Sequence, residues 1–145
     1  MSQPCRAVCL FGVALSVLFA IIPLNAAGGG LQGYFNYRQV SVSNNQVVLT
    51  VDVAILNRTG GDLQNAIISV RNSFDPRTTL ASFPAISILA GKMTDLSQVL
   101  NVPQSEFQQW QRGARPMFFI SYTDVSGTTV QQPLNLFRRP LKEGN

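Results

Sequence analysis

Few residues in this chain of 145 could do chemistry, and histidine is absent. Without histidine, neither a serine–histidine or cysteine–histidine nucleophile system nor a histidine-based zinc site can be built. The seven acidic residues occur singly, at Asp52, Asp62, Asp75, Asp95, Glu106, Asp124 and Glu143. This spacing lacks the carboxylate pair of a glycosidase and the alternating acidic positions of a calcium loop. We therefore expect no metal and no cofactor.

A serine–lysine dyad is the remaining catalytic arrangement to consider. Lys92 and Lys142 are available, but neither lies near a serine in a motif that activates the hydroxyl. The glycines at positions 28–30 do not indicate a phosphate-binding loop, because no predicted strand precedes them and no predicted helix follows. Three carboxylates fall in predicted turns, where they usually bond nearby backbone: Asp62, Asp75 and Asp124. The sequence thus predicts a protein that is not an enzyme.

Aromatic side chains are the first candidates for binding a ligand. Five of them could stack on sugar rings if they shared one exposed face: Tyr34, Phe35, Tyr37, Trp110 and Tyr122. The favoured alternative is that Trp110 is a core residue, closing one end of the fold under a crossing segment. In that alternative Phe35 and either Phe118 or Phe119 also belong to the core.

Basic side chains are the second candidates. Arg138, Arg139 and Lys142 gather beside Glu143, which is more typical of a solvated tail than of a nucleic-acid surface. No nucleic-acid partner is expected, and anionic lipid headgroups or acidic polysaccharide remain a weaker alternative. The candidate binding surface combines aromatic and basic positions: Tyr34, Tyr37, Trp110, Arg112, Arg115, Arg138 and Arg139.

Residues 1–26 have the pattern of a secretory signal peptide. Arg6 precedes an apolar run over residues 10–22, which Pro23 ends, and Ala26 offers a small residue for cleavage. An uncleaved anchor is the alternative, although the stretch 7–22 is at or below the short end of what spans a bilayer. We expect export to the periplasm or the cell exterior, most consistent with a bacterial envelope, and only transient membrane contact through this segment.

Both cysteines, Cys5 and Cys9, lie in this predicted leader. Cys9 precedes the apolar run, which is the wrong place for a lipid-modified cysteine, and the exported domain is expected to be free of disulfides. Residues 27–33 are expected to form a flexible glycine-rich N-terminus, residues 34–138 one folded domain, and residues 139–145 a basic C-terminal tail.

Alternating apolar residues predict strands in the first half of the domain. Residues 46–56 alternate over a β-branched run, and a turn at 57–62 leads to a second run at 63–70, so these two are expected to form a hairpin. The alternation over residues 34–42 predicts a first strand, and Asn44 and Asn45 predict a turn from it into the strand at 46–56.

In the second half, short strands are predicted at 79–83, at an edge, and at 85–90. The spacing of apolar residues then changes, and residues 94–100 and 105–110 are predicted as one or two short helical turns, with Ser105 as a possible cap. Residues 116–122 and 128–137 form a terminal hairpin around a turn at 124–127. The fold class is all-β: a small antiparallel β-sandwich of about seven strands with crossing connections.

Three segments carry a resemblance to a known family: VDVAILNRTGGDL at 51–63, ISILAGK at 86–92 and FISYTDVSG at 119–127. In this order they resemble an immunoglobulin-like β-sandwich of secreted and cell-surface bacterial proteins, over about residues 34–138. The resemblance implies the fold but little of the function, because adhesins, chaperones, fibre subunits and spacers share it. The cysteine pair and core tryptophan of antibody-type domains are absent from the pattern. Asn57 would be a glycosylation site only in a eukaryote, and is otherwise part of a turn.

The sequence therefore predicts a non-enzymatic module that binds a protein or a glycan at the cell envelope. One alternative is a structural subunit that self-associates through sheet edges in a fibre, layer or envelope complex, since the chain has low charge and glutamine-rich segments. A second alternative is an accessory chaperone that offers an open edge strand to other exported proteins.

Overall fold

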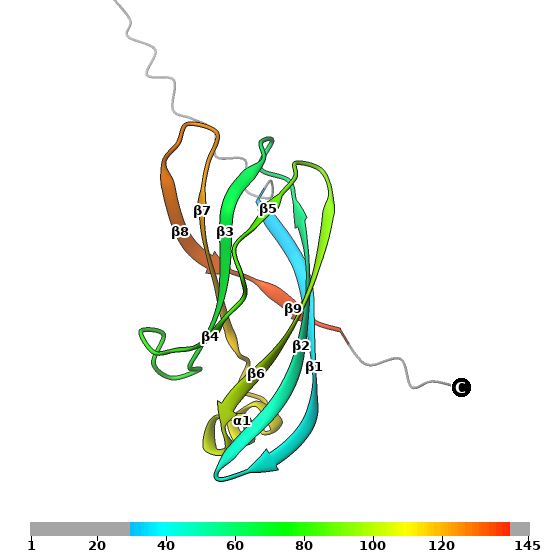
Figure 1. The fold of residues 1–145 in the computed structure, drawn as a ribbon, viewed down its shortest axis with the longest axis vertical. Helices are drawn as coiled ribbons and strands as arrows, with labels where there is room; N and C mark the ends of the chain where they lie inside the picture. Colours follow the sequence, from blue (N-terminus) through cyan, green and yellow to red (C-terminus); the bar gives the residue numbers. More distant parts are fainter. Residues whose placement is uncertain (1–29, 140–145) are drawn as a thin grey trace, which may run out of the picture.

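The computed structural model describes residues 30–139, which form two β-sheets and one short helix in a sandwich-like arrangement (Figure 1). The four-stranded sheet has the order β6-β2-β1-β9 and consists of β1 (Leu31–Ser43), β2 (Gln46–Asn57), β6 (Met93–Pro103) and β9 (Leu136–Arg138). The five-stranded sheet has the order β4-β3-β7-β8, with β5 paired to β3, and consists of β3 (Leu63–Arg71), β4 (Thr79–Ser82), β5 (Ile86–Ile88), β7 (Met117–Thr123) and β8 (Thr129–Leu134). Helix α1 (Gln104–Gln111) joins β6 to β7.

The predicted two-layer β architecture is thus confirmed, with more strands than the seven expected. The predicted signal peptide, its cleavage site and both cysteines lie outside the described residues, as does the basic tail beyond Arg139. No helix in the described part of the chain is long and apolar enough to cross a membrane. The first strand begins at Leu31, inside the segment predicted to be a flexible N-terminus.

The hairpin of β1 and β2 is confirmed. Asn44 and Asn45 have φ of 51° and 59°, and Ser43 pairs with Gln46 across them. Two consecutive residues with positive φ match the twist of a two-residue hairpin, and asparagine tolerates that conformation better than most residues do.

The predicted hairpin of 46–56 with 63–70 is wrong, because β2 and β3 lie in different sheets. Asn57, which is fully buried, bends the connection: its amide nitrogen donates to the carbonyls of Gly61, at 2.8 Å, and Ile88, at 3.0 Å. Its side-chain oxygen accepts from the backbone N–H and the hydroxyl of Thr59. Alternation indicates that each segment is a strand with one buried face. It does not indicate whether the next strand pairs with it in the same sheet or packs against it from the opposing sheet. The buried amide is also unavailable for glycosylation in the folded domain.

Residues 94–100 are not helical turns but part of strand β6, which pairs with β2 from Met93 to Pro103. Leu96 and Leu100 are four positions apart, and such positions share a face in both a helix and a strand. The long hydrogen-bonded pairing with β2 stabilises this segment as a strand and not as a helix. The single helix then begins after Pro103 as N-cap, with no side-chain cap, so Ser105 does not have the predicted role.

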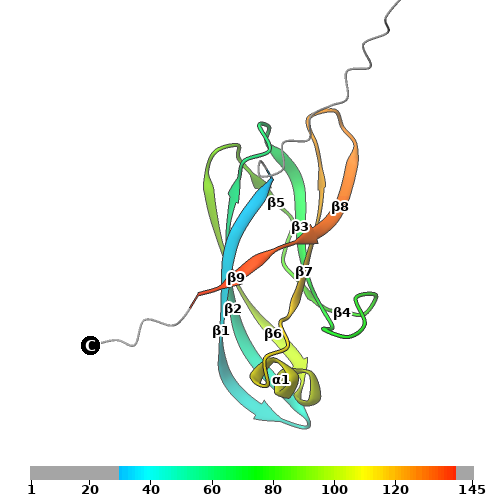
Figure 2. The same cartoon turned by 180° about the vertical axis from the view of Figure 1, so that it is seen from behind.

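The predicted terminal hairpin forms between β7 and β8, but the segment 128–137 divides into two strands. Leu134 is buried in the five-stranded sheet and Leu136 in the four-stranded one, with exposed Asn135 between them. Strand β9 crosses over and pairs parallel with β1, Gly33 lying opposite Leu136 (Figure 2). A Cβ at Gly33 would collide with the carbonyl oxygen of Ala54, so glycine permits this close approach.

The core lies between the two sheets, where alternate residues of β1, β2, β3 and β7 point inward. Helix α1 closes one end of it. The rings of Phe107 and Trp110 lie 5.8 and 5.7 Å from that of Tyr37. The Trp110 Nε1–H donates to Glu106 Oε1 at 2.7 Å, and the same oxygen accepts from the backbone N–H and hydroxyl of Ser73, at 2.8 and 2.7 Å. A buried carboxylate is held in place here by several hydrogen bonds.

Candidate binding face

The structure divides the predicted surface residues into three groups. Tyr37 and Trp110 are only 7% and 2% exposed, so they are core residues and cannot serve as a binding surface. Both have large rings on inward-facing positions, where burial is most favourable. Arg112 and Arg115 are exposed beside α1, at the end of the sandwich that Trp110 closes. Tyr34, Arg138 and Arg139 come together around β1.

Arg138, the last residue of β9, and Arg139 after it lie on opposite sides of β1, because successive residues of an extended chain point to opposite faces. The Arg138 guanidinium lies 4.4 Å from the ring centre of Tyr37, on the core side. The Arg139 guanidinium lies 4.9 Å from the ring centre of Tyr34, on the outer side. The backbone N–H of Arg139 donates to the carbonyl of Phe35 at 2.9 Å, which continues the pairing of β9.

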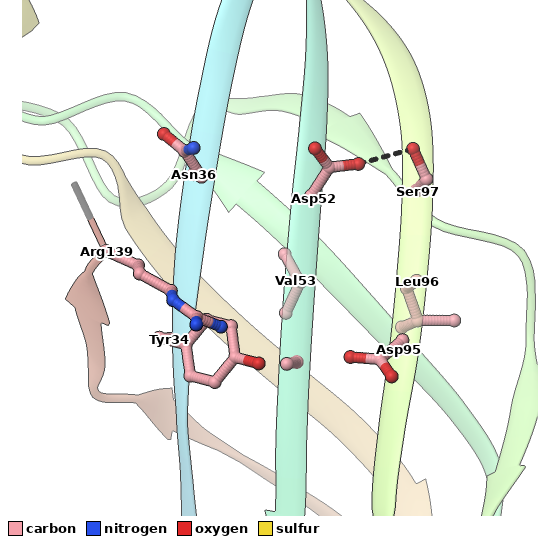
Figure 3. A pocket seen from close by; sticks show the side chains of 9 residues that line it. Tyr34, Asn36, Asp52, Val53, Asp95, Leu96, Ser97 and Arg139 are labelled. Carbon is pink, nitrogen blue, oxygen red and sulfur yellow. Dashed lines mark hydrogen bonds between the residues drawn. The ribbon is translucent and has the colours of Figure 1, made fainter. Parts of the chain in front are cut away.

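The outer face of the four-stranded sheet carries a row of polar side chains around Tyr34 (Figure 3). The register places Asn36, Asp52 and Ser97 opposite one another on β1, β2 and β6. The neighbouring row is Tyr34, Ala54 and Asp95. Alternation along each strand keeps both rows on the same face.

A hollow of about 410 Å³ opens between these side chains, with Ala54 among its lining residues. Tyr34 and Asp95 flank Ala54 from strands on either side, about 9.6 Å apart given the usual strand spacing. Ala54 itself is only 2% exposed, so the hollow is bounded mainly by the larger side chains around it. We call this space the polar hollow. Its volume is within the range of small-ligand sites.

The groups that line the polar hollow keep unused hydrogen-bonding capacity. The Ser97 hydroxyl donates to Asp52 Oδ1 at 2.6 Å, which leaves the second oxygen of Asp52 open. Asn36 Oδ1 accepts from the backbone N–H of Tyr37 at 2.8 Å, and its amide nitrogen is open. The carboxylate of Asp95 has no hydrogen-bond or ion-pair partner among the described residues. The hollow thus offers both donors and acceptors to a ligand.

A second hollow, of about 450 Å³, adjoins the first at Tyr34. It is mainly apolar, and its apolar side chains include Leu31, Leu56, Met93 and Phe137. Phe137 is 70% exposed and Met93 is 47% exposed. We call it the apolar hollow. Together the two hollows make an amphipathic face with Tyr34 at the boundary.

Sequence reasoning found Tyr34 and Arg139 but missed Asp95, Met93 and Phe137. The sequence does not align Asp52 and Ala54 with Asp95, because the spacing of apolar residues predicts helical turns over 94–100. The alternation of exposed Asp95, Ser97 and Val99 is the signal that could have identified the strand.

The other predicted carboxylate positions are structural. Asp62 accepts from the backbone N–H of Ala90 at 2.8 Å. The Ser126 hydroxyl, followed by the backbone N–H of Thr128, lowers the pKa of Asp124 below its ordinary value of 3.8. Burial, and secondly the charge of Asp124, raises the pKa of Tyr122. Within residues 30–139, no three cysteine or acidic side chains are grouped closely enough to hold a metal ion.

No protein-family model and no curated protein matches this chain. Solved structures resemble it distantly. The structural-genomics target SoR45 has a TM-score of 0.41 and 9% identity, over 79% of this chain and 90% of that one. A β-glucuronidase from glycoside hydrolase family 2 has a TM-score of 0.34 and 13% identity, over 77% of this chain but 12% of the enzyme. A protein from Archaeoglobus fulgidus has a TM-score of 0.31 and 10% identity, over 74% of this chain and 97% of that one. These likenesses are to β-rich proteins and identify no family.

Proposed function

We propose that this domain is a non-enzymatic interaction module, exported to the periplasm or the cell exterior, that binds an envelope protein or glycan through the outer face of the β6-β2-β1-β9 sheet. The observation that carries the proposal is the pair of hollows that meet at Tyr34. Contiguous apolar surface beside open polar groups is typical of binding sites.

Binding is favoured over catalysis by the surroundings of the two carboxylates. Asp95 is exposed, and half-buried Asp52 accepts a hydrogen bond from Ser97. Neither is enclosed by apolar side chains, the environment that a general-acid carboxyl needs. The chain has no histidine to act in its place.

We also infer that the sandwich is immunoglobulin-like. Its support is the strand order, in which β1, β2 and β6 occupy the places of strands A, B and E of that fold. Strands β3, β7 and β8 occupy the places of C, F and G, with β4 beside β3. Domains of this architecture commonly bind through a sheet face or a loop cluster.

The test measures retention of the purified exported protein on isolated envelope material. The variants are Tyr34→Ala at the proposed face and Gln131→Ala, an exposed residue of β8 in the other sheet, as the matched control. We expect Tyr34→Ala to reduce retention at least tenfold and Gln131→Ala to retain like the wild type. Equal retention of both variants would contradict the proposal.

The same assay identifies the class of ligand. Envelope material is treated beforehand with protease in one arm and with a mixture of glycan-degrading enzymes in another. Loss of Tyr34-dependent retention in the first arm assigns a protein, and loss in the second a glycan. Absence of any retention by the wild type would also overturn the proposal.

A further inference from the structure

We propose that the loop between β3 and β4, residues 72–78, mediates self-association by inserting Phe74 into the apolar hollow of a second copy of this chain. This goes beyond the proposed function, because it assigns a second copy as a partner and adds a loop that lies outside the proposed ligand-binding face. The apolar hollow takes part in both contacts. We call residues 72–78 the Phe74 loop.

Phe74 is 71% exposed, and local hydrogen bonds hold it in that position. The side-chain oxygen of Asn72 accepts from the backbone N–H groups of Phe74, at 2.8 Å, and Asp75, at 3.0 Å. The backbone N–H of Asn72 donates to the carbonyl of Thr78 at 3.0 Å, which closes the base of the loop. An exposed aromatic on an ordered loop can enter a partner without a large ordering cost.

Both arms of the Phe74 loop are fixed to the fold. Asp75 accepts from the backbone N–H of Arg77 at 3.1 Å and from the Thr78 hydroxyl at 2.7 Å. The Arg71 guanidinium donates to the carbonyl of Pro76 at 3.0 Å. Ser73 is bound to buried Glu106 of α1. The loop is therefore already ordered in the free protein.

The Phe74 loop also carries a free positive charge. The guanidinium of Arg77 has no hydrogen-bond or ion-pair partner among the described residues. The nearby carboxylate of Asp75 is already used in bonds to the loop itself. A partner that complements this tip needs an apolar cavity with a carboxylate at its rim.

The apolar hollow provides the apolar surface, and Asp95 of the adjoining polar hollow provides the carboxylate. Met93 and Phe137 offer exposed apolar surface, and Leu56 lies between them in the lining. Asp95 follows Met93 by two residues on β6, so it lies on the same face about 6.7 Å further along the strand. Its carboxylate has no partner among the described residues. The aromatic side chain of Phe74 is therefore complementary to the apolar surface of the hollow, and the positive charge of Arg77 to the negative charge of Asp95.

The two surfaces lie on opposite flanks of the molecule. Figures 1 and 2 both show the loop that precedes β4 on the side away from β1 and β9. Phe74 therefore cannot reach the hollow of its own chain. The contact between copies is head-to-tail, and such a contact extends into open chains unless its rotation closes a ring.

The first experiment is analytical ultracentrifugation of the purified exported protein over a concentration series up to about 1 mM, where weak contacts are populated. We expect the mean mass to rise with concentration. Phe74→Ala should weaken association at least tenfold. Val125→Ala, at an exposed loop tip of the β7–β8 hairpin, is the matched control and should associate like the wild type.

The second experiment uses the head-to-tail geometry. Phe74→Ala keeps the hollow but lacks the inserted ring, and Met93→Arg keeps the ring but blocks the hollow. Each variant alone should be monomeric, and a mixture should form one-to-one dimers and nothing larger. Circular dichroism of each variant checks that it is folded.

A wild type that stays monomeric at every concentration would overturn the proposal. So would Phe74→Ala that associates like the wild type, or a folded pair of variants that stays monomeric when mixed. Because Phe74 is not on the sheet face, Phe74→Ala should retain envelope binding. Self-association can therefore fail while Tyr34-dependent binding to envelope material persists, and the reverse.

Discussion

The two ends of strand β1 lead to regions that use similar residue types in opposite ways. Near α1, the carboxylate of Glu106 and the indole of Trp110 are buried and bonded to each other and to Ser73. On the outer face, the carboxylate of Asp95 and the ring of Tyr34 border open space. A fully satisfied polar cluster stabilises one structure, whereas unsatisfied groups in contact with water are available for recognition. We therefore expect the first region to contribute mainly to stability, and we propose that the second contributes to binding.

The largest expected effect is on the α1 end. Trp110→Ala should lower the free energy of unfolding by about 3–5 kcal/mol, because it removes a large buried ring and leaves a cavity. Urea denaturation followed by circular dichroism measures this change. A loss below about 1 kcal/mol would show that Trp110 does not support the core.

A smaller effect is expected from Glu106→Ala. This change leaves the Ser73 N–H and the Trp110 Nε1–H without their carboxylate acceptor, at a cost of about 1–3 kcal/mol of stability. Glu106→Gln keeps an acceptor oxygen and should cost less, as the same denaturation experiment can show. Equal stability of the wild type and the alanine variant would remove the contrast between the regions.

On the outer face, Asp95→Ala should change stability by less than about 0.5 kcal/mol, since the side chain is exposed. The same variant should reduce retention on envelope material severalfold, because the polar hollow loses its open carboxylate. Thr129→Ala, an exposed strand residue of the other sheet, is the control. A strongly destabilised but normally binding Asp95→Ala protein would reverse the assignment of the two regions.

The smallest effect concerns pH and a carboxylate that belongs to neither region. Because the pKa of Asp124 is lowered in the folded protein, its hydrogen bonds contribute stability above the unfolded value near 3.8. That contribution should be lost as the pH falls from about 4 through the folded pKa. NMR titration of the Asp124 carboxyl measures the lowered pKa, and Asp124→Asn should show a flatter stability profile below pH 4. An unshifted titration would contradict this prediction.

The sequence predicted the individual strands better than their arrangement. The β1–β2 hairpin could be predicted, because Asn44 and Asn45 favour the positive φ that its turn requires. The separation of β2 from β3 could not, since it depends on the bonds that Asn57 makes to Ile88, 31 residues further on. Local patterns do not report such distant contacts.

The candidate site was predicted only in part for the same reason. Tyr34 and Arg139 could be proposed from their residue types. Asp95 and Met93 belong to the site only because the pairing of β6 with β2 places them beside Ala54 and Leu56. The apolar hollow also depends on the crossing of β9, which brings Phe137 beside β1. Tertiary pairing, and not local propensity, decides these positions.

The parallel pairing of β9 with β1 has a mechanical consequence. Gly33, Tyr34 and Phe35 lie beside Leu136, Phe137 and Arg138 in the same direction, so the first and last described strands are direct neighbours. Tension applied between them along the strands would load their hydrogen bonds together in shear, instead of opening them one after another. Arg138, within this pairing, contacts the ring of Tyr37, and Arg139, which follows it, contacts the ring of Tyr34. If the domain were anchored at one of these strands and pulled from the other, the hydrogen bonds between β1 and β9 would therefore be the first to resist its extension.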